Sequence, residues 1–244
     1  MYLKRKADAY LNAWKSDPNR SPLIIKGPRQ VGKTETIDYF AAHNYRSVVE
    51  INFVEEPKYR AITADGYGAN TIVRNISLID PAKKFIPGDT LIFFDEIQAH
   101  PDIATALKFF KIDGKYDVIC SGSMLGISYK QIESNSVGYK TDYEMRSLDF
   151  EEFLWARGYD EAVIESMFTH LCDATPFSEV EMNVFSTAFM DYCVLGGMPA
   201  VVASHIRTGT FEGTLQLQRQ LILDYQEDIR KYAQGLDQAR ILNL

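Results

Sequence analysis

The chain has 244 residues, of which 46% are hydrophobic and 24% are charged. This globular mixture excludes a collagen-like repeat and a wholly disordered chain, and the length is typical of one large domain or of one domain followed by part of a second. The formal net charge of −7 disfavours bulk electrostatic binding to nucleic acid or to anionic membranes.

The start of the chain and its cysteines indicate the compartment. Lys4, Arg5 and Lys6 are followed by Ala7-Asp8-Ala9-Tyr10 instead of the long apolar stretch of a signal peptide. No apolar run in the sequence approaches the ~18 residues that a membrane-spanning helix needs. Three widely spaced cysteines with apolar neighbours predict buried thiols in a reducing compartment: Cys120, Cys172 and Cys193. We therefore expect a cytoplasmic protein that does not span a membrane.

Helix and strand patterns alternate over the first half of the chain. Apolar residues at helical spacing predict a helix from Leu3 to Trp14. Apolar runs ended by turn residues predict strands at 23–26, 45–53, 90–94 and 115–120, and helices are predicted at 34–43, 70–78 and 101–110. Residues 55–68 are predicted to be irregular. This alternation predicts an α/β fold with a mostly parallel sheet between helices.

The pattern changes near residue 150. Helices are predicted at 150–156, 161–172, 180–194 and 211–232, with no strong strand among them. Gly196–Pro199 is interpreted as a turn between two helices. We therefore place a domain boundary here, with residues 1–149 as the α/β core and residues 150–244 as a helical region.

A phosphate-binding loop is predicted between the first strand and the helix that follows it. Residues 27–34 match the pattern G-x-x-x-x-G-K-[ST] at every fixed position. Its glycines allow N–H groups to point at phosphate oxygens, and the helix adds the positive end of its dipole. Lys33 is predicted to contact the β- and γ-phosphates, and the Thr34 hydroxyl to bind Mg²⁺. The predicted nucleotide-binding residues are Gly27, Pro28, Arg29, Gln30, Val31, Gly32, Lys33 and Thr34.

Two carboxylates end the predicted strand at 90–94. Asp95 is predicted to hold Mg²⁺ opposite Thr34, directly or through water. Glu96 is predicted to be the general base that accepts a proton from the attacking water. Together with Lys33, this pair favours hydrolysis of the nucleotide over simple storage.

Polar residues at two other strands have open interpretations. Ser123 lies at the predicted carboxyl edge of the sheet, where its hydroxyl would contact the γ-phosphate or the water, with Ser121 as the second choice. A Ser–Gly turn explains the same residues equally well. Asn52 would either restrain Glu96 until a partner binds or occupy a satisfied core or edge position.

Adenine is the expected base, because the sequence lacks the N-K-x-D motif with which GTPases recognise guanine. The leading hypothesis is a Mg²⁺-dependent ATPase whose hydrolysis drives a conformational change in a C-terminal domain or a protein partner. The alternative is a nucleotide-gated binding module with little turnover. A small-molecule kinase is disfavoured, because residues 126–142 contain no clustered arginines for a lid.

The phosphate loop, the strand that ends in the two carboxylates and five other segments occur in the same order as in a known family. They are Gly27–Thr34, Leu91–Gln98, Ala106–Phe110, Ser121–Gly126, Phe150–Leu154, Gly196–Pro199 and Asp224–Tyr232. Together these segments resemble a prokaryotic family of AAA+-type P-loop ATPases that carries a C-terminal domain of unknown function. The similarity extends over essentially the whole chain.

The resemblance implies an ATP-binding core of five parallel strands, followed by a helical region that enters the C-terminal domain. It also implies that relatives continue past Leu244, and that copies of the chain assemble so that an arginine of one completes the site of the next. The candidate arginines are Arg146, Arg157, Arg207, Arg219, Arg230 and Arg240. Arg29, Gln30 and Gln98 are features of the resemblance without an assigned role.

Overall fold

The computed structural model describes residues 1–123 and 138–232, which form two compact units. The α/β unit comprises Ala7–Arg29 and Lys33–Met145. The helical unit comprises Met1–Lys6, Gln30–Gly32 and the chain from Arg146 onward. Several parts of the sequence predictions lie outside the described residues: residues 124–126, most of the segment 126–142 considered for a kinase lid, and residues 233–244 of the helical region, with Arg240.

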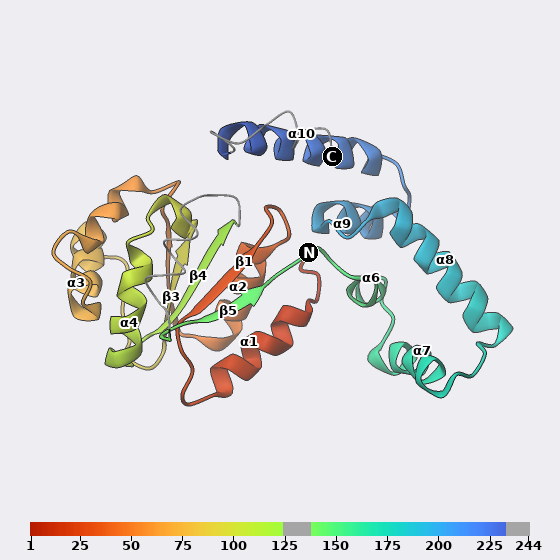
Figure 1. Ribbon diagram of the computed structural model, residues 1–244, viewed down its shortest axis with the longest axis horizontal. Coiled ribbons are helices and arrows are strands. Elements are labelled where there is room, and N and C mark those ends of the chain that lie inside the picture. The colour runs from red at the N-terminus through yellow and green to blue at the C-terminus, as the bar shows by residue number, and fades with distance from the viewer. Residues whose placement is uncertain (124–137, 233–244) are drawn as a thin grey trace. The chain divides into compact units, whose positions relative to one another are not determined.

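The α/β unit is built on a sheet whose five described strands are all parallel, in the order β2-β3-β4-β1-β5 (Figure 1). β3 is buried along its whole length, as expected of a parallel strand covered on both faces. The predicted α/β class with a parallel sheet is therefore confirmed. The strands are β1 (Leu23–Gly27), β2 (Ser47–Asn52), β3 (Thr90–Asp95), β4 (Asp117–Ser123) and β5 (Thr141–Glu144).

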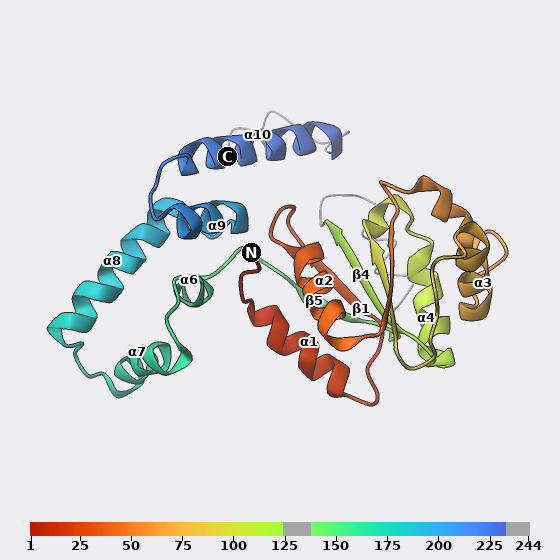
Figure 2. The same cartoon turned by 180° about the vertical axis from the view of Figure 1, so that it is seen from behind.

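Helices cover both faces of this sheet. α4 (Ile103–Asp113), with α3 (Ala69–Ile79) beside it, lies on the face seen in Figure 1. α1 (Lys6–Ser16) and α2 (Lys33–Asn44) lie on the opposite face, seen in Figure 2. The described part of the unit also has two 3-10 helices. They are η1 (Pro57–Thr63), within the segment predicted to be irregular, and η2 (Ile97–Ala99).

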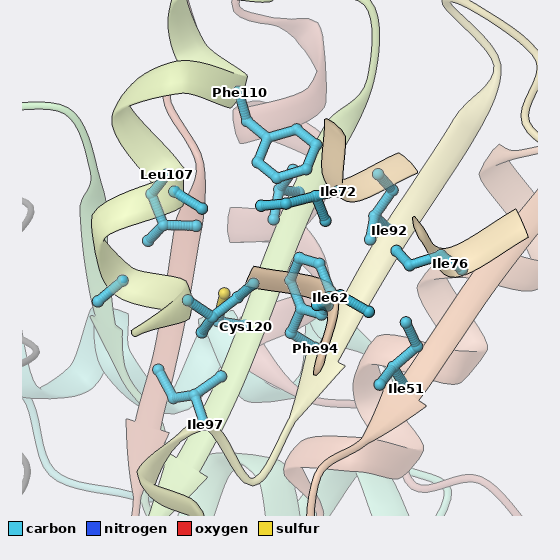
Figure 3. Packing of buried hydrophobic residues seen from close by; sticks show 14 of the residues in the cluster. Ile51, Ile62, Ile72, Ile76, Ile92, Phe94, Ile97, Leu107, Phe110 and Cys120 are labelled. Carbon is cyan, nitrogen blue, oxygen red and sulfur yellow. The ribbon is translucent and has the colours of Figure 1, made fainter. Parts of the chain in front are cut away.

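The largest core of the α/β unit lies between the sheet and the pair α3 and α4 (Figure 3). Ile92 and Phe94 are alternate residues of β3, so their side chains point to the same face of the sheet. They pack there with Ile76 of α3 and with Leu107 and Phe110 of α4, and all five are at most 2% exposed. This packing fixes β3 and therefore the position of the carboxylates that end it.

The helical unit has a smaller core of its own, centred on Leu148, Phe153 and Val201. Helices are present at all four predicted places, and a further one, α9 (Pro199–Thr208), begins at the last residue of the predicted turn 196–199. Gly197 is needed in this turn because a Cβ there would lie 2.0 Å from the carbonyl oxygen of Leu148. The helices are α6 (Phe150–Ala156), α7 (Glu161–Asp173), α8 (Glu179–Leu195), α9 (Pro199–Thr208) and α10 (Thr214–Tyr232).

Within the described parts of the chain, no helix combines the length and the apolar character that crossing a membrane requires. The three cysteines are all free. Burial of the thiol was predicted for each and is confirmed for Cys120 of β4, where it raises the pKa. The prediction is wrong for Cys172 and Cys193, which are exposed. They lie on α7 and α8, which bury few residues, so apolar neighbours in sequence do not enclose a thiol there.

Candidate nucleotide-binding site

The predicted phosphate loop lies between the carboxyl end of β1 and the first residue of α2. Gly27 has no room for a side chain, because a Cβ there would lie 2.0 Å from the carbonyl oxygen of Met145. Gln30 and Gly32 have positive φ angles of 62° and 89°, which turn the backbone tightly. The loop therefore has the sharply curved backbone that phosphate-binding nests share.

Lys33 folds back onto this loop. Its Nζ donates to the carbonyl oxygens of Gly27, at 3.0 Å, and Pro28, at 2.6 Å. Burial lowers the pKa of the Lys33 amino group, while the charges of Glu96 and Asp95 oppose that shift. A desolvated cation attracts a phosphate oxyanion more strongly than a solvated one does, so the position of Lys33 fits a bound nucleotide.

Asp95, at the end of β3, accepts hydrogen bonds from residues of α2, β2 and β4 and from the residue that follows it. Its Oδ2 accepts from the Thr34 hydroxyl at 3.2 Å and from Asn52 Nδ2 at 3.4 Å. Its Oδ1 accepts from the Glu96 backbone N–H at 2.9 Å and from the Ser121 hydroxyl. The structure thus brings Thr34 and Asp95 together at the carboxyl edge of the sheet.

Hydroxyl and carboxylate oxygens are ligands that Mg²⁺ prefers, so this pair fits that ion. No cluster of three or more His, Cys, Asp or Glu side chains that could hold a metal ion occurs in the described residues. Magnesium at Thr34 and Asp95 would therefore depend on phosphate oxygens and water for its remaining ligands, which is its usual arrangement with nucleotides.

Glu96 has an unusual backbone and a side-chain partner that the sequence analysis did not assign. Its φ of 54° is left-handed, a conformation that costs a non-glycine residue energy and is concentrated at functional sites. Its Oε2 accepts a hydrogen bond from Gln98 Nε2. A Cβ at Gly122 would lie 2.8 Å from Gln98 Oε1, so the glycine leaves the space that Gln98 occupies. Gln98 Oε1 is buried and without a hydrogen-bond partner in the described structure.

The two serines of β4 have different surroundings. Ser121 is bonded to Asp95, whereas Ser123 lies opposite Gly27 in the β1–β4 register, beside the start of the phosphate loop. The Ser123 hydroxyl is buried and has no hydrogen-bond partner among the described residues. Buried hydroxyls are ordinarily bonded, so this orphaned group fits a phosphate oxygen or a water molecule as its missing partner.

Asn52 lies on the edge strand β2 and is satisfied locally. Its Oδ1 accepts from the backbone N–H groups of Val54 and Glu55, at 2.9 and 3.1 Å, while its amide reaches Asp95. The side chain that bonds to the Glu96 carboxylate is Gln98, whereas the sequence suggested Asn52 as the restraint on Glu96. The alternative interpretation, a satisfied residue at an edge position, describes Asn52 correctly.

Two contacts within the helical unit involve the middle of the phosphate loop. Gln30 Nε2 donates to Asp224 of α10 at 2.9 Å. The guanidinium of Arg5 donates to the carbonyl oxygen of Val31 at 2.7 Å. Arg5 belongs to the charged start of the chain, and nothing in the local sequence pattern connects it with a loop residue 26 positions later.

Comparison with known proteins identifies the family of the chain. Residues 19–154, more than half of the chain, match the sequence model of a family described as an AAA domain. A search of curated proteins gave no match. Among solved structures, PCH-2 of C. elegans is similar with a TM-score of 0.38 and 11% identity, over 71% of this chain and 48% of that one. The family match spans the phosphate loop, the carboxylates of β3 and the serines of β4. The chain therefore belongs to the AAA domain family of P-loop ATPases.

Proposed function

We propose that this chain binds Mg²⁺-ATP at residues 27–34 and hydrolyses it, and that hydrolysis changes the conformation of the helical unit, of a C-terminal domain or of a protein partner. Membership of the AAA family supports nucleotide binding and hydrolysis in general. The proposal that these residues bind Mg²⁺-ATP and hydrolyse it rests on the contact between Thr34 and Asp95, with Lys33 and Glu96 next to them in the chain.

Each residue would have a separate role. N–H groups of the loop and the Lys33 ammonium would hold the phosphates, while Thr34 and Asp95 would hold Mg²⁺. The ion, when bound, would neutralise charge on the phosphate oxygens. Glu96 would accept a proton from a water molecule while the oxygen of that water attacks the γ-phosphorus. The bond between the γ-phosphorus and the oxygen that bridges the β- and γ-phosphates would break, which releases ADP and phosphate. The Ser123 hydroxyl would donate to the γ-phosphate or to that water.

Coupling to the helical unit is supported by the loop itself. Gln30–Gly32 belong to the helical unit, where Gln30 bonds to Asp224 and Val31 bonds to Arg5. A change of loop conformation on binding or hydrolysis would act directly on these contacts. We also propose, from the family alone, that copies of the chain assemble, with an arginine from one copy completing the site of the next.

The alternative is a nucleotide-gated binding module with little turnover. The hydrogen bond from Gln98 to Glu96 favours it specifically, because it occupies one oxygen of the proposed base. The two functions differ in what Gln98 does. In an ATPase, Gln98 orients Glu96, so Gln98→Ala lowers turnover; in a gated module, Gln98 blocks Glu96, so the same change raises turnover.

Phosphate release from Mg²⁺-ATP tests the proposal, with nucleotide binding measured on the same samples. We expect Glu96→Gln to lower turnover by at least about a hundredfold and to retain binding, because only the base is lost. Lys33→Ala should lose both. Binding without turnover in the wild-type chain and a gain in Gln98→Ala would favour the gated module. A wild-type chain that binds no nucleotide would contradict both functions.

A further inference from the structure

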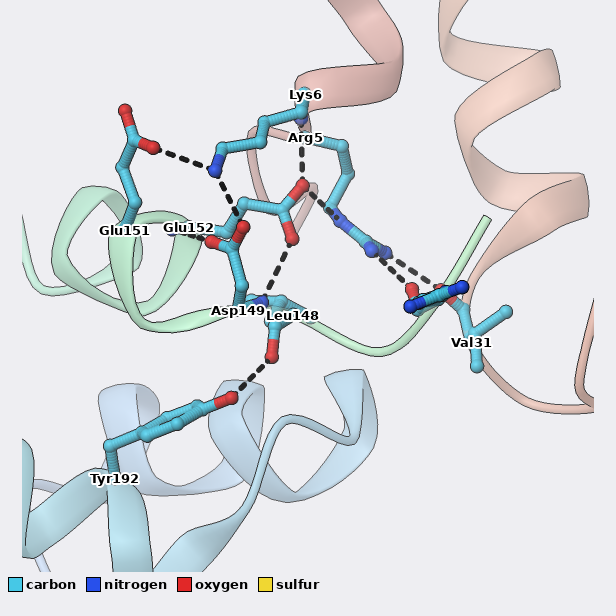
Figure 4. Close-up of polar contacts among 9 residues, drawn as sticks. Arg5, Lys6, Val31, Leu148, Asp149, Glu151, Glu152 and Tyr192 are labelled. Carbon is cyan, nitrogen blue, oxygen red and sulfur yellow. Dashed lines mark hydrogen bonds and ion pairs between the residues drawn. The ribbon is translucent and has the colours of Figure 1, made fainter. Parts of the chain in front are cut away.

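Arg5 is a buried cation in a segment that precedes the first helix of the sheet unit, and it is only 5% exposed. Within the helical unit, its guanidinium donates to the backbone carbonyl oxygens of Val31, at 2.7 Å, and Arg146, at 2.6 Å. Its Nε donates to Glu152 Oε1 at 3.1 Å (Figure 4). One side chain therefore joins the phosphate loop to the start of the helical region.

Glu152 is itself fixed. It is the third residue of α6 and forms a capping box with Asp149, whose backbone N–H it accepts at 3.1 Å. It also accepts from the Lys6 backbone N–H at 2.7 Å (Figure 4). A capping box holds both of its side chains in one geometry. Because Glu152 cannot move freely, the guanidinium that it pairs with is held in place as well.

The consequence for the loop follows from the planarity of the peptide bond. In a trans peptide, the carbonyl of one residue and the N–H of the next point in opposite directions. Arg5 holds the Val31 carbonyl, so it also sets the direction of the Gly32 N–H. This peptide needs an external restraint, because Gly32, with φ of 89°, can rotate with little steric cost.

We propose that Arg5 is a positioning residue for nucleotide binding, which orients the Gly32 N–H towards the phosphates without touching the nucleotide. This inference rests on the proposed nucleotide binding, and it does not require hydrolysis. Arg5 supplies what lysine cannot, since its planar fork reaches two carbonyls and a carboxylate at once. Val31 and Glu152 are thus the loop end and the helix end of one buried link.

The test measures the affinity of the folded chain for Mg²⁺ and a slowly hydrolysed ATP analogue, AMP-PNP, by calorimetry. Arg5→Lys keeps a positive charge near Glu152 but loses the two carbonyl contacts. We expect it to weaken binding about tenfold, the effect of one misdirected charge-assisted hydrogen bond. The matched control is Tyr192→Phe, which removes a bond of 2.9 Å to the Leu148 carbonyl in the same unit. It should bind within about twofold of the wild-type chain.

A readout at the loop separates positioning from general destabilisation. In protein labelled with ¹⁵N-glycine, AMP-PNP should shift the Gly32 amide in the wild-type chain and in Tyr192→Phe, and shift it less in Arg5→Lys. If Arg5→Lys does not fold, Glu152→Gln keeps Arg5 and should weaken binding about threefold.

Unchanged affinity and an unchanged Gly32 shift in a folded variant would overturn the inference. A wild-type chain that binds AMP-PNP but does not hydrolyse ATP would contradict the proposed hydrolysis and leave the role of Arg5 intact.

Discussion

The two units of the chain bury their apolar side chains to different extents. In the α/β unit, every residue of β3 is buried, and the core on one face of the sheet includes residues of four strands (β1 to β4) and of the helices α3 and α4. In the helical unit, α7 buries only Ile164, and α8 buries Phe185, Ala188 and Leu195. Several of its large apolar residues are exposed, among them Leu171, Val180 and Met190.

This difference implies that the α/β unit is the more rigid of the two and that the helical unit rearranges more easily. Asp95, Ser121 and Ser123 of the candidate site stand at the carboxyl ends of the buried strands β3 and β4, so their relative positions are strongly determined. The helical unit has few buried apolar contacts, which is a property of regions that open or rearrange at low free-energy cost. A rigid site in one unit and a more easily rearranged helical unit would suit the proposed coupling of ATP hydrolysis to a change of conformation.

The largest expected effect is in the core of the α/β unit. Phe94→Ala removes a fully buried ring and should destabilise that unit by about 3–5 kcal/mol. Phe189→Ala on α8, where the residue is 50% exposed, should cost less than about 1 kcal/mol. Equal losses in the two variants would contradict the difference in packing between the units.

The chain provides a fluorescent reporter for each unit, because its two tryptophans are Trp14 and Trp155. Trp155→Phe leaves Trp14 to report on the α/β unit, and Trp155 Nε1 has no hydrogen-bond partner in the described structure to lose. Trp14→Phe leaves Trp155 as the reporter, at the cost of the bond from Trp14 Nε1 to the Ser21 carbonyl at 2.8 Å. Urea unfolding followed at each tryptophan measures the two units separately.

A smaller effect is expected at the start of α8. The Ser178 hydroxyl accepts from the Glu181 N–H as part of a capping box, and Ser178→Ala should cost about 1 kcal/mol. The loss should appear in the transition reported by Trp155 and be absent from the one reported by Trp14. The same shift at both tryptophans would mean that the units unfold together.

The smallest effect concerns pH. Burial lowers the pKa of His100, while the nearby Asp102 opposes the shift. The unfolded chain has a His pKa of about 6.5, so just below that value it binds more protons than the folded chain does. The stability of the α/β unit should therefore fall as the pH drops through about 6.5 and level off below the folded pKa.

His100→Gln should remove this dependence on pH, whereas His43→Gln, at an exposed position of α2, should retain it. Urea midpoints measured at Trp14 between pH 5 and pH 8 give the comparison. A dependence that persists in His100→Gln would assign it to another group.

The sequence predicts those features that local pattern determines. The apolar run before Asp95 identifies β3, and the spacing from Gly27 to Thr34 identifies the turn between β1 and α2. Parallel strands then place their carboxyl ends at one edge, so the meeting of Thr34 with Asp95 could be foreseen. β5 could not, because Thr141–Glu144 is short and has no apolar run.

Other features depend on the folded arrangement and could not be predicted from local sequence. Arg5 and Glu152 are separated by 147 positions, and each looks like an ordinary surface charge beside its neighbours. Gln98 lies two residues from Glu96, but only the fold shows that Gly122 makes space for it. Exposure of Cys172 and Cys193 likewise depends on how few partners α7 and α8 have.

The contact of Gly27 with the end of the α/β unit affects how a mutational scan of this chain would be interpreted. Met145, the last residue of that unit, donates from its N–H to the Lys26 carbonyl at 2.7 Å and places its own carbonyl against Gly27. A loss of activity on replacing Gly27 would be attributed to the phosphate motif. Its first physical effect, however, would be a backbone collision with Met145. A loss of activity at Gly27 would therefore also reflect displacement of the chain around Met145, and not only damage to phosphate binding.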